Sequence, residues 1–207
     1  MFGLLLVAVA AIHLTLLATQ DGSVFWSPDE GGKYLQVRTL ELSRAAGAPI
    51  LPYAGRPFDP HYEFYPPGTV YPRMESDGRV RFGWAQHFSH LAGLPLRWWG
   101  TPGLYVWPML GLLLTCWCVF LLYPGMSPLA LLAVGMVALA SPLSFYGVLF
   151  WEHSLAVALV LLTHLFLRNM VAHSGWAGGL GYGACALLSA GAALALRAET
   201  LLALVAI

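Results

Sequence analysis

Long apolar runs and one polar stretch alternate along this chain, and their order predicts its elements. The first apolar run covers residues 2–18. After a polar stretch, further apolar runs cover about 104–123, 128–148, 151–168, and 179–200 or beyond. Each run approaches the roughly 20 apolar residues that a helix needs to cross a membrane. The pattern therefore predicts an all-α polytopic membrane protein with about five transmembrane helices, divided into residues 1–19, a loop over 20–103, and a four-helix segment over 104–207.

The first run allows two interpretations, a retained transmembrane helix or a cleaved signal peptide. A signal peptide carries positive charge before its apolar core and small residues at its cleavage site. No Lys or Arg precedes this run, and the "LATQDGS" that follows is a poor cleavage site. We favour the retained helix.

The polar stretch over residues 20–103 is predicted to fold as a subdomain, because structureless loops of that length are uncommon in compact proteins. "SPDEGGKYLQVRTLELSRAAG" is typical of a helix that starts with Ser27 and Pro28 and ends at Gly47. The Asp77-Gly78 turn signal between short alternating runs predicts a small β-hairpin.

The end of the polar stretch has the features of a membrane interface. "WAQHFSHLAG" predicts a short amphipathic helix, and "LRWWG" follows it directly. Tryptophans gather where a chain enters the lipid headgroups. We expect Trp98 and Trp99 to lie at that boundary.

Composition agrees with a membrane protein. Of the 207 residues, 58% are hydrophobic and only 10% are charged, whereas soluble domains have about 25% charged residues. The formal net charge is zero and no basic tract is present, which argues against a nucleic-acid partner. The three cysteines lie inside apolar runs without zinc-type spacing, so the sequence indicates neither a disulfide framework nor a metal finger.

The charged residues predict an orientation. All but four of them lie between Asp21 and Arg97, and the exceptions are Glu152, Arg168, Arg197 and Glu199. Short loops rich in Lys and Arg face the cytoplasm, which favours a cytoplasmic position for the link that carries Arg168 and His173. We therefore expect an inner-membrane protein whose 20–103 loop, Glu152 and Arg197 are extracytoplasmic.

Asp29 and Glu30 have two candidate roles. Acidic residues in the first turn of a helix complement its dipole, typically by about 0.3–1 kcal/mol, and Glu30 also completes a capping box with Ser27. The pair also lies close after the first apolar run, and Lys33 follows on the same helical face. Capping and catalysis both stay open here.

Glu152 and Arg197 are the other charged candidates. Glu152 stands between two apolar runs, and ionisable residues at membrane depth are costly and usually functional; a solvated acid at a helix start is the simpler alternative. Arg197 lies near the outer end of the last run. Its alternatives are an ion pair with Glu199 or a side chain that extends toward the headgroups.

One resemblance connects these features. A first span, then "SPDEGGKYLQVRTL", a long outer loop, "SPLSFYGVLFWEHSLAVALVLL" and "LLSAGAALALRAETLLALV" together resemble the membrane glycosyltransferases of the type-C fold. The likeness is greatest to the protein mannosyltransferase and aminoarabinose transferase group. It covers nearly the whole chain as the N-terminal part of that architecture. Members of the group have several further membrane helices, and this chain ends at "LLALVAI" without a polar stop, so we expect missing C-terminal helices or an additional membrane subunit.

The resemblance implies sugar transfer from a polyprenyl-phosphate donor at the outer face of the membrane, with an acid of the first loop as the catalytic base. We therefore expect membrane lipid and a lipid-linked sugar as partners. Glu152 would orient the acceptor or hold a divalent cation, Mg²⁺ or Mn²⁺. The expected site joins three acids with three phosphate-binding residues: Asp29, Glu30 and Glu152 with Lys33, His153 and Arg197.

A shared cleft is the structural requirement of this hypothesis, because base, acceptor and leaving phosphate must meet within hydrogen-bond reach. Asp29 and Glu152 should face that cleft, with Lys33 or Arg197 at its border. The alternative is a non-enzymatic membrane subunit or a transporter fragment. A transporter is expected to have discontinuous helices near its substrate site.

Overall fold

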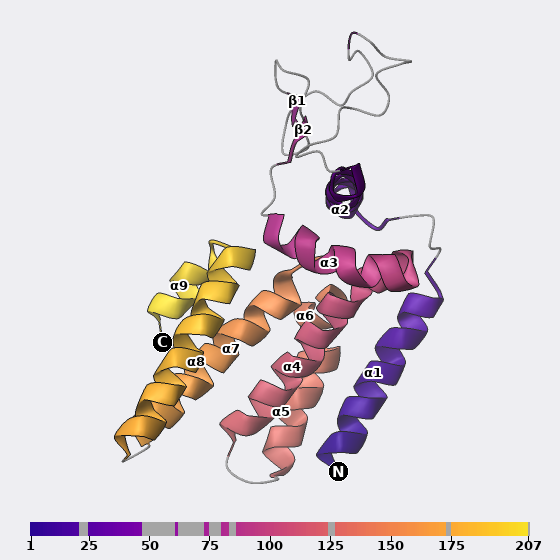
Figure 1. Ribbon diagram of the computed structural model, residues 1–207. Coiled ribbons are helices and arrows are strands. Elements are labelled where there is room, and N and C mark those ends of the chain that lie inside the picture. The colour runs from indigo at the N-terminus through magenta and orange to yellow at the C-terminus, as the bar shows by residue number, and fades with distance from the viewer. Residues whose placement is uncertain are drawn as a thin grey trace. The chain divides into compact units, whose positions relative to one another are not determined.

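The structure is a computed structural model that describes residues 1–20, 25–46, 61, 73–74, 80–82, 86–123, 127–172 and 175–206 (Figure 1). The chain forms two compact units, one from Met1–Gly22 with Tyr105–Ile207 and one from Ser23–Leu104. Gly47, the Asp77-Gly78 turn and His173, which the sequence analysis singled out, lie outside the described residues.

The described residues of the first unit form helices and connecting segments, without strands. In chain order its helices are α1 (Phe2–Ala18), α4 (Val106–Leu122), α5 (Pro128–Leu139), α6 (Pro142–Tyr146), α7 (His153–Ala172), α8 (Trp176–Leu196) and α9 (Thr200–Val205). The long ones run alongside one another (Figure 1). α7 packs against α8 on one flank and α4 on the other, and α4 also contacts α1 and α5.

Three helical segments of the described chain are long and apolar enough to cross a membrane: Thr101–Leu122, His153–Ala172 and Ala177–Leu196. Phe2–Ala18 and Pro128–Leu139 are also apolar but shorter. The expectation of a helical membrane protein is therefore confirmed, whereas the count of five spans is not.

The predicted helix over 128–148 is wrong as a single element, because it breaks between α5 and α6. The Ser141 hydroxyl accepts a hydrogen bond from the Leu143 N–H at 3.2 Å and donates one to the Val137 carbonyl at 2.7 Å. Pro142 has no N–H to donate and disfavours helical geometry in the residue before it. After α6, the backbone of residues 147–150 is not helical but is buried. Non-helical backbone at membrane depth is tolerated where protein covers it.

α4 and α7 approach so closely that only glycine fits at their crossing. A Cβ at Gly111 would lie 2.3 Å from the Leu155 nitrogen. The buried Ser154 hydroxyl donates to the Pro108 carbonyl at 2.8 Å across the same crossing, and Thr115 donates to the Ser154 carbonyl at 3.4 Å. These contacts set the position of the first turn of α7, and hence of the two residues that precede Ser154.

His13 connects α1 to α6 inside the unit. Its side chain is fully buried. Nδ1 lies 2.8 Å from the Val9 carbonyl and Nε2 lies 3.2 Å from the Ser144 hydroxyl. Since a carbonyl only accepts, Nδ1 carries the proton, and Nε2 accepts from Ser144. Both ring nitrogens of this buried histidine therefore have hydrogen-bond partners inside the unit.

The second unit contains α2 (Pro28–Ala46), α3 (Gln86–Trp99) and the 3₁₀ helix η1 (Thr101–Tyr105), whose last residue belongs to the first unit. The Ser89 hydroxyl of α3 donates to the buried Gln36 side chain of α2 at 2.9 Å. Arg97 of α3 pairs with Glu41 of α2, also at 2.9 Å. These two bonds hold α3 against α2 near both ends of α3.

Two short strands also belong to the second unit. β1 (Arg73–Met74) and β2 (Val80–Arg81) pair antiparallel, with Arg73 opposite Arg81. The turn that would join them lies outside the described residues, so the complete hairpin stays a prediction.

Candidate functional site

Glu30 forms the capping box that the sequence predicted for the start of α2. The Glu30 N–H donates to the Ser27 hydroxyl at 3.3 Å. In return, Glu30 Oε2 accepts the backbone N–H groups of Trp26 at 2.8 Å and Ser27 at 3.2 Å. The residue is fully buried. Its carboxylate therefore fixes the start of the helix by satisfying N–H groups that would otherwise lack a partner.

Asp29 differs from its neighbour. It is half-buried in the first turn of α2, and within the described chain its carboxylate makes no hydrogen bond or ion pair. Lys33, one turn further along the same face, is buried with 4% of its surface exposed. Of the two adjacent acids, only Glu30 is engaged in holding the helix start.

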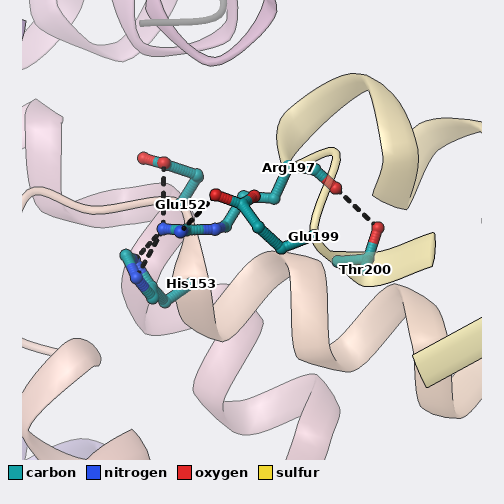
Figure 2. Close-up of polar contacts among 5 residues, drawn as sticks. All are labelled: Glu152, His153, Arg197, Glu199 and Thr200. Carbon is teal, nitrogen blue, oxygen red and sulfur yellow. Dashed lines mark hydrogen bonds and ion pairs between the residues drawn. The ribbon is translucent and has the colours of Figure 1, made fainter. Parts of the chain in front are cut away.

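Arg197 is the centre of a charged cluster in the first unit. Its Nη1 lies 3.6 Å from Glu152 Oε1 and contacts both ring nitrogens of His153, with Nδ1 at 3.2 Å (Figure 2). Its Nη2 donates to Glu199 at 3.2 Å. Because arginine only donates and a neutral imidazole has one acceptor nitrogen, at most one of the two contacts is a hydrogen bond, and the other is a close approach of the guanidinium to the ring.

The chain brings Arg197 into place by ending α8 early. The last apolar run was expected to continue to residue 200 or beyond, but α8 ends at Leu196 and Arg197 has extended backbone, with φ −149° and ψ 116°. The Thr200 hydroxyl donates to the Arg197 carbonyl at 2.6 Å, and α9 begins there (Figure 2). The break turns the guanidinium toward the start of α7 instead of along the helix.

Glu152 is placed by the start of α7. Its carbonyl accepts the Ala156 N–H at 2.9 Å, which makes it the residue that begins the helix. Only 7% of its surface is exposed. The simpler alternative was a solvated acid at a helix start; Glu152 does begin the helix, but its carboxylate is buried beside Arg197. Buried carboxylates need such a partner to offset the loss of water.

Glu199 is the exposed member of the cluster. Its side chain is 69% exposed. A backbone hydrogen bond, followed by the charge of Arg197, lowers the pKa of Glu199 below its ordinary value. The ion pair with Arg197 that the sequence analysis gave as an alternative is thus present, together with the contacts of Arg197 with Glu152 and His153.

Aromatic rings flank the cluster. The His153 ring stacks on Tyr146 with centroids 4.5 Å apart and on Trp151 at 4.7 Å, and the interplanar angles are 19° and 30°. Sequence reasoning missed Tyr146 and Trp151, although Trp151 is next to Glu152 in a short link between apolar runs. Flat aromatic surfaces beside a cation and a carboxylate are suited to hold an amphipathic ligand.

An apolar cavity of about 850 Å³ lies in the same unit. α7 and α8 supply nearly all of its lining, with Leu204 of α9. Thr163 is its polar residue, and Gly179 and Gly183 leave room along α8. A space of this size and character suits a hydrocarbon chain.

The six expected site residues divide between the two units. Glu152, His153 and Arg197 meet in the first unit. The other three, Asp29, Glu30 and Lys33, share one helix of the second unit. Their convergence on one cleft stays a prediction. Within the described ranges, three or more His, Cys, Asp or Glu side chains do not gather as a metal site would require.

Comparison with known proteins adds no family to this picture, because no family model, curated protein or solved structure matches the chain.

Proposed function

We propose that this protein is an inner-membrane glycosyltransferase that moves a sugar from a polyprenyl-phosphate donor to an acceptor at the extracytoplasmic face. The observation that carries the proposal is Arg197, a cation held at the junction of two apolar helices by a buried carboxylate and an imidazole. Arginine binds phosphate oxygens with two parallel N–H groups. Such a group at the end of membrane helices suits a phosphate whose tail stays in lipid.

The apolar cavity supports the lipid half of the donor. α7 and α8 line it, and these helices also bring His153 and Arg197 together. In the proposal a prenyl chain occupies this cavity while its phosphate contacts Arg197. In this proposal α1 and α5 also cross the membrane, which gives a bundle of about five spans. The end of α7 that carries Arg168 faces the cytoplasm. Further helices or another subunit complete the enzyme.

The transfer step assigns one role to each group. The acceptor hydroxyl attacks the anomeric carbon, its proton passes to Asp29, and the bond from that carbon to the phosphate oxygen breaks. Polyprenyl phosphate leaves with the bonding electrons, and Arg197 or Lys33 stabilises its charge. Glu152 orients the acceptor, since Arg197 stands where a divalent cation would have to bind, and Glu30 holds the helix that carries the base.

Binding of a polyprenyl phosphate to the detergent-solubilised protein tests the phosphate site, with the uncharged polyprenol as the matched ligand. Arg197→Gln should weaken binding of the phosphate by about 10- to 100-fold, the equivalent of roughly 1.5–3 kcal/mol for hydrogen bonds to a charged group. Polyprenol binding should not change. Arg197→Lys keeps the charge and should lose less.

Arg168→Gln is the control variant. Arg168 lies at the other end of α7 and donates to the Leu121 carbonyl at 3.0 Å. It should bind both ligands as the unsubstituted protein does. Equal loss in the Arg168 and Arg197 variants, or no loss in either, would contradict the phosphate site.

The alternative, a transporter fragment or non-enzymatic subunit, also has an observation in its favour. Two apolar runs are discontinuous, one between α5 and α6 and one at Arg197 between α8 and α9. Discontinuous helices are typical of transporter substrate sites. Transfer of a labelled sugar from a polyprenyl-phosphate donor in membranes separates the two functions, because a transporter or subunit would bind the lipid without producing a glycosylated acceptor.

A further inference from the structure

α3 has three distinct faces. Its buried face consists of Phe88, Ser89, Ala92, Gly93, Pro95 and Leu96. The rest of its surface is exposed, and it divides into two edges when residues are placed 100° apart around the helix. One edge is polar, with Gln86, His90 and Arg97. The other contains Leu91, Leu94 and Trp98, which are 39%, 40% and 66% exposed, with the exposed His87 among them.

The C-terminal end of α3 is joined tightly to the start of a candidate span. Gly100 closes the helix with φ 66°, a conformation that suits glycine, and its N–H donates to the Leu96 carbonyl at 2.9 Å. The segment Thr101–Leu122 then begins, and Gly103 lies directly on α3, since a Cβ there would be 2.1 Å from the Pro95 carbonyl oxygen. The first turn of a membrane-spanning segment is therefore packed on the last turns of α3.

We propose that α3 lies in the membrane surface as an in-plane anchor, with its apolar edge in the acyl boundary and its polar edge in water. The partner is a lipid surface. Amphipathic helices of this kind bury their apolar side by about 5–10 Å. The proposal is independent of sugar transfer and holds for a transporter or a subunit as well.

Two features favour lipid over a protein surface as the occupant. The close contact at Gly103 keeps the exposed edges of α3 within a few residues of the start of a span, where lipid headgroups are the surrounding medium. Trp98 and Trp99, 66% and 58% exposed, stand in the last turn before that start. Tryptophan is enriched at this depth because its ring is apolar and its N–H is polar.

An anchored α3 would fix the height of α2 above the membrane. The Ser89–Gln36 and Arg97–Glu41 bonds connect the two helices. α2 carries Asp29 in its first turn. The anchor therefore holds this acid at a set distance from the lipid surface.

Spin labels on adjacent residues test the anchor in lipid vesicles. His90→Cys and Leu91→Cys lie next to each other but about 100° apart around the helix. Both are made in a Cys185→Ser background, since Cys185 is the exposed native thiol among the three cysteines, and the background protein must take no label. Collisions with oxygen, which partitions into lipid, are compared with collisions with a water-soluble nickel chelate.

We expect the ratio of oxygen to nickel collisions to be several-fold higher at Leu91 than at His90. Leu94→Cys provides a second label on the apolar edge and should agree with Leu91. Free access of nickel to both edges would overturn the proposal, because the helix would then stand in water. Exclusion of both reagents at Leu91 and Leu94 would also overturn it, since protein and not lipid would cover that edge.

Discussion

Replacement of Gly111 by alanine is the sharpest test of the α4–α7 crossing. The new Cβ would lie 2.3 Å from the Leu155 nitrogen and 2.6 Å from the Ser154 carbonyl carbon. Non-bonded carbon atoms prefer about 3.5–4.0 Å, so the two backbones must separate by about 1 Å or more. A change of side-chain rotamer cannot relieve this clash, because the atoms nearest to the new Cβ belong to the main chain of α7.

The magnitude follows from three contributions. Overpacking typically costs about 1–3 kcal/mol. Separation also strains the bond from Ser154 to the Pro108 carbonyl, and a hydrogen bond of this kind contributes about 0.5–1.5 kcal/mol. Against these losses, alanine stabilises a helix interior by about 0.5–1 kcal/mol relative to glycine. The net loss is roughly 0.5–4 kcal/mol, and each kcal/mol lowers Tm by about 2–4 °C for a chain of this size.

Gly135→Ala is the matched control, since Gly135 is also inside an apolar helix but a Cβ there meets nothing within 4 Å. Thermal unfolding in one detergent, followed by tryptophan fluorescence, should give a lower Tm for Gly111→Ala and an unchanged or higher Tm for Gly135→Ala. Polyprenyl phosphate binding should also weaken in Gly111→Ala, because the crossing positions the first turn of α7. Equal Tm values for the two variants would refute the close approach.

Two further predictions concern the acids. Glu30→Gln keeps an oxygen that accepts the N–H groups at the helix start, so it should lower the free energy of unfolding by at most about 1 kcal/mol. Asp29→Asn should abolish sugar transfer and leave the unfolding transition unchanged. Equal and mild effects of the two substitutions on transfer would exclude Asp29 as the base. A lowered pKa means that ionised Glu199 stabilises the fold above the ordinary carboxyl range and loses this effect as pH falls through its lowered value. The stability difference between the unsubstituted protein and Glu199→Gln should therefore narrow on acidification, and a difference that widens in acid would contradict the pairing with Arg197.

The sequence was sufficient to predict those helix ends that one short motif determines. The Ser27-Pro28 pair and Glu30 predicted the start of α2, and their hydrogen bonds are those of the capping box. The same Ser-Pro signal stands at Ser141-Pro142, where it was missed because apolar residues on both sides favoured one continuous span. The break between α5 and α6 was thus predictable from a motif that the analysis had already used elsewhere.

The residues of the charged cluster were expected at one site from the family resemblance, whereas no local motif predicted their contacts. Arg197 was recognised, and so was its pair with Glu199, because the two residues are close in sequence. Its contacts with Glu152 and His153 span 44 or more positions and depend on where α8 ends. No glycine or proline marks that end, so the apolar periodicity extended the predicted helix past Arg197, whereas α8 ends at Leu196.

The break between α5 and α6 has a consequence for biogenesis. Residues 128–148 are one hydrophobic segment of about the length that crosses lipid, with the Ser141-Pro142 break inside it. The native non-helical backbone of residues 147–150 is tolerated only once neighbouring protein covers it, and Leu112 of α4 does so at Gly147, where a Cβ would come within 2.6 Å of Leu112 Cδ2. Because α4 precedes this segment in the chain, that cover is present as soon as residues 147–150 enter lipid, and α4 must pair with the segment during insertion. The charged site matures later, since it also needs α7 and the end of α8.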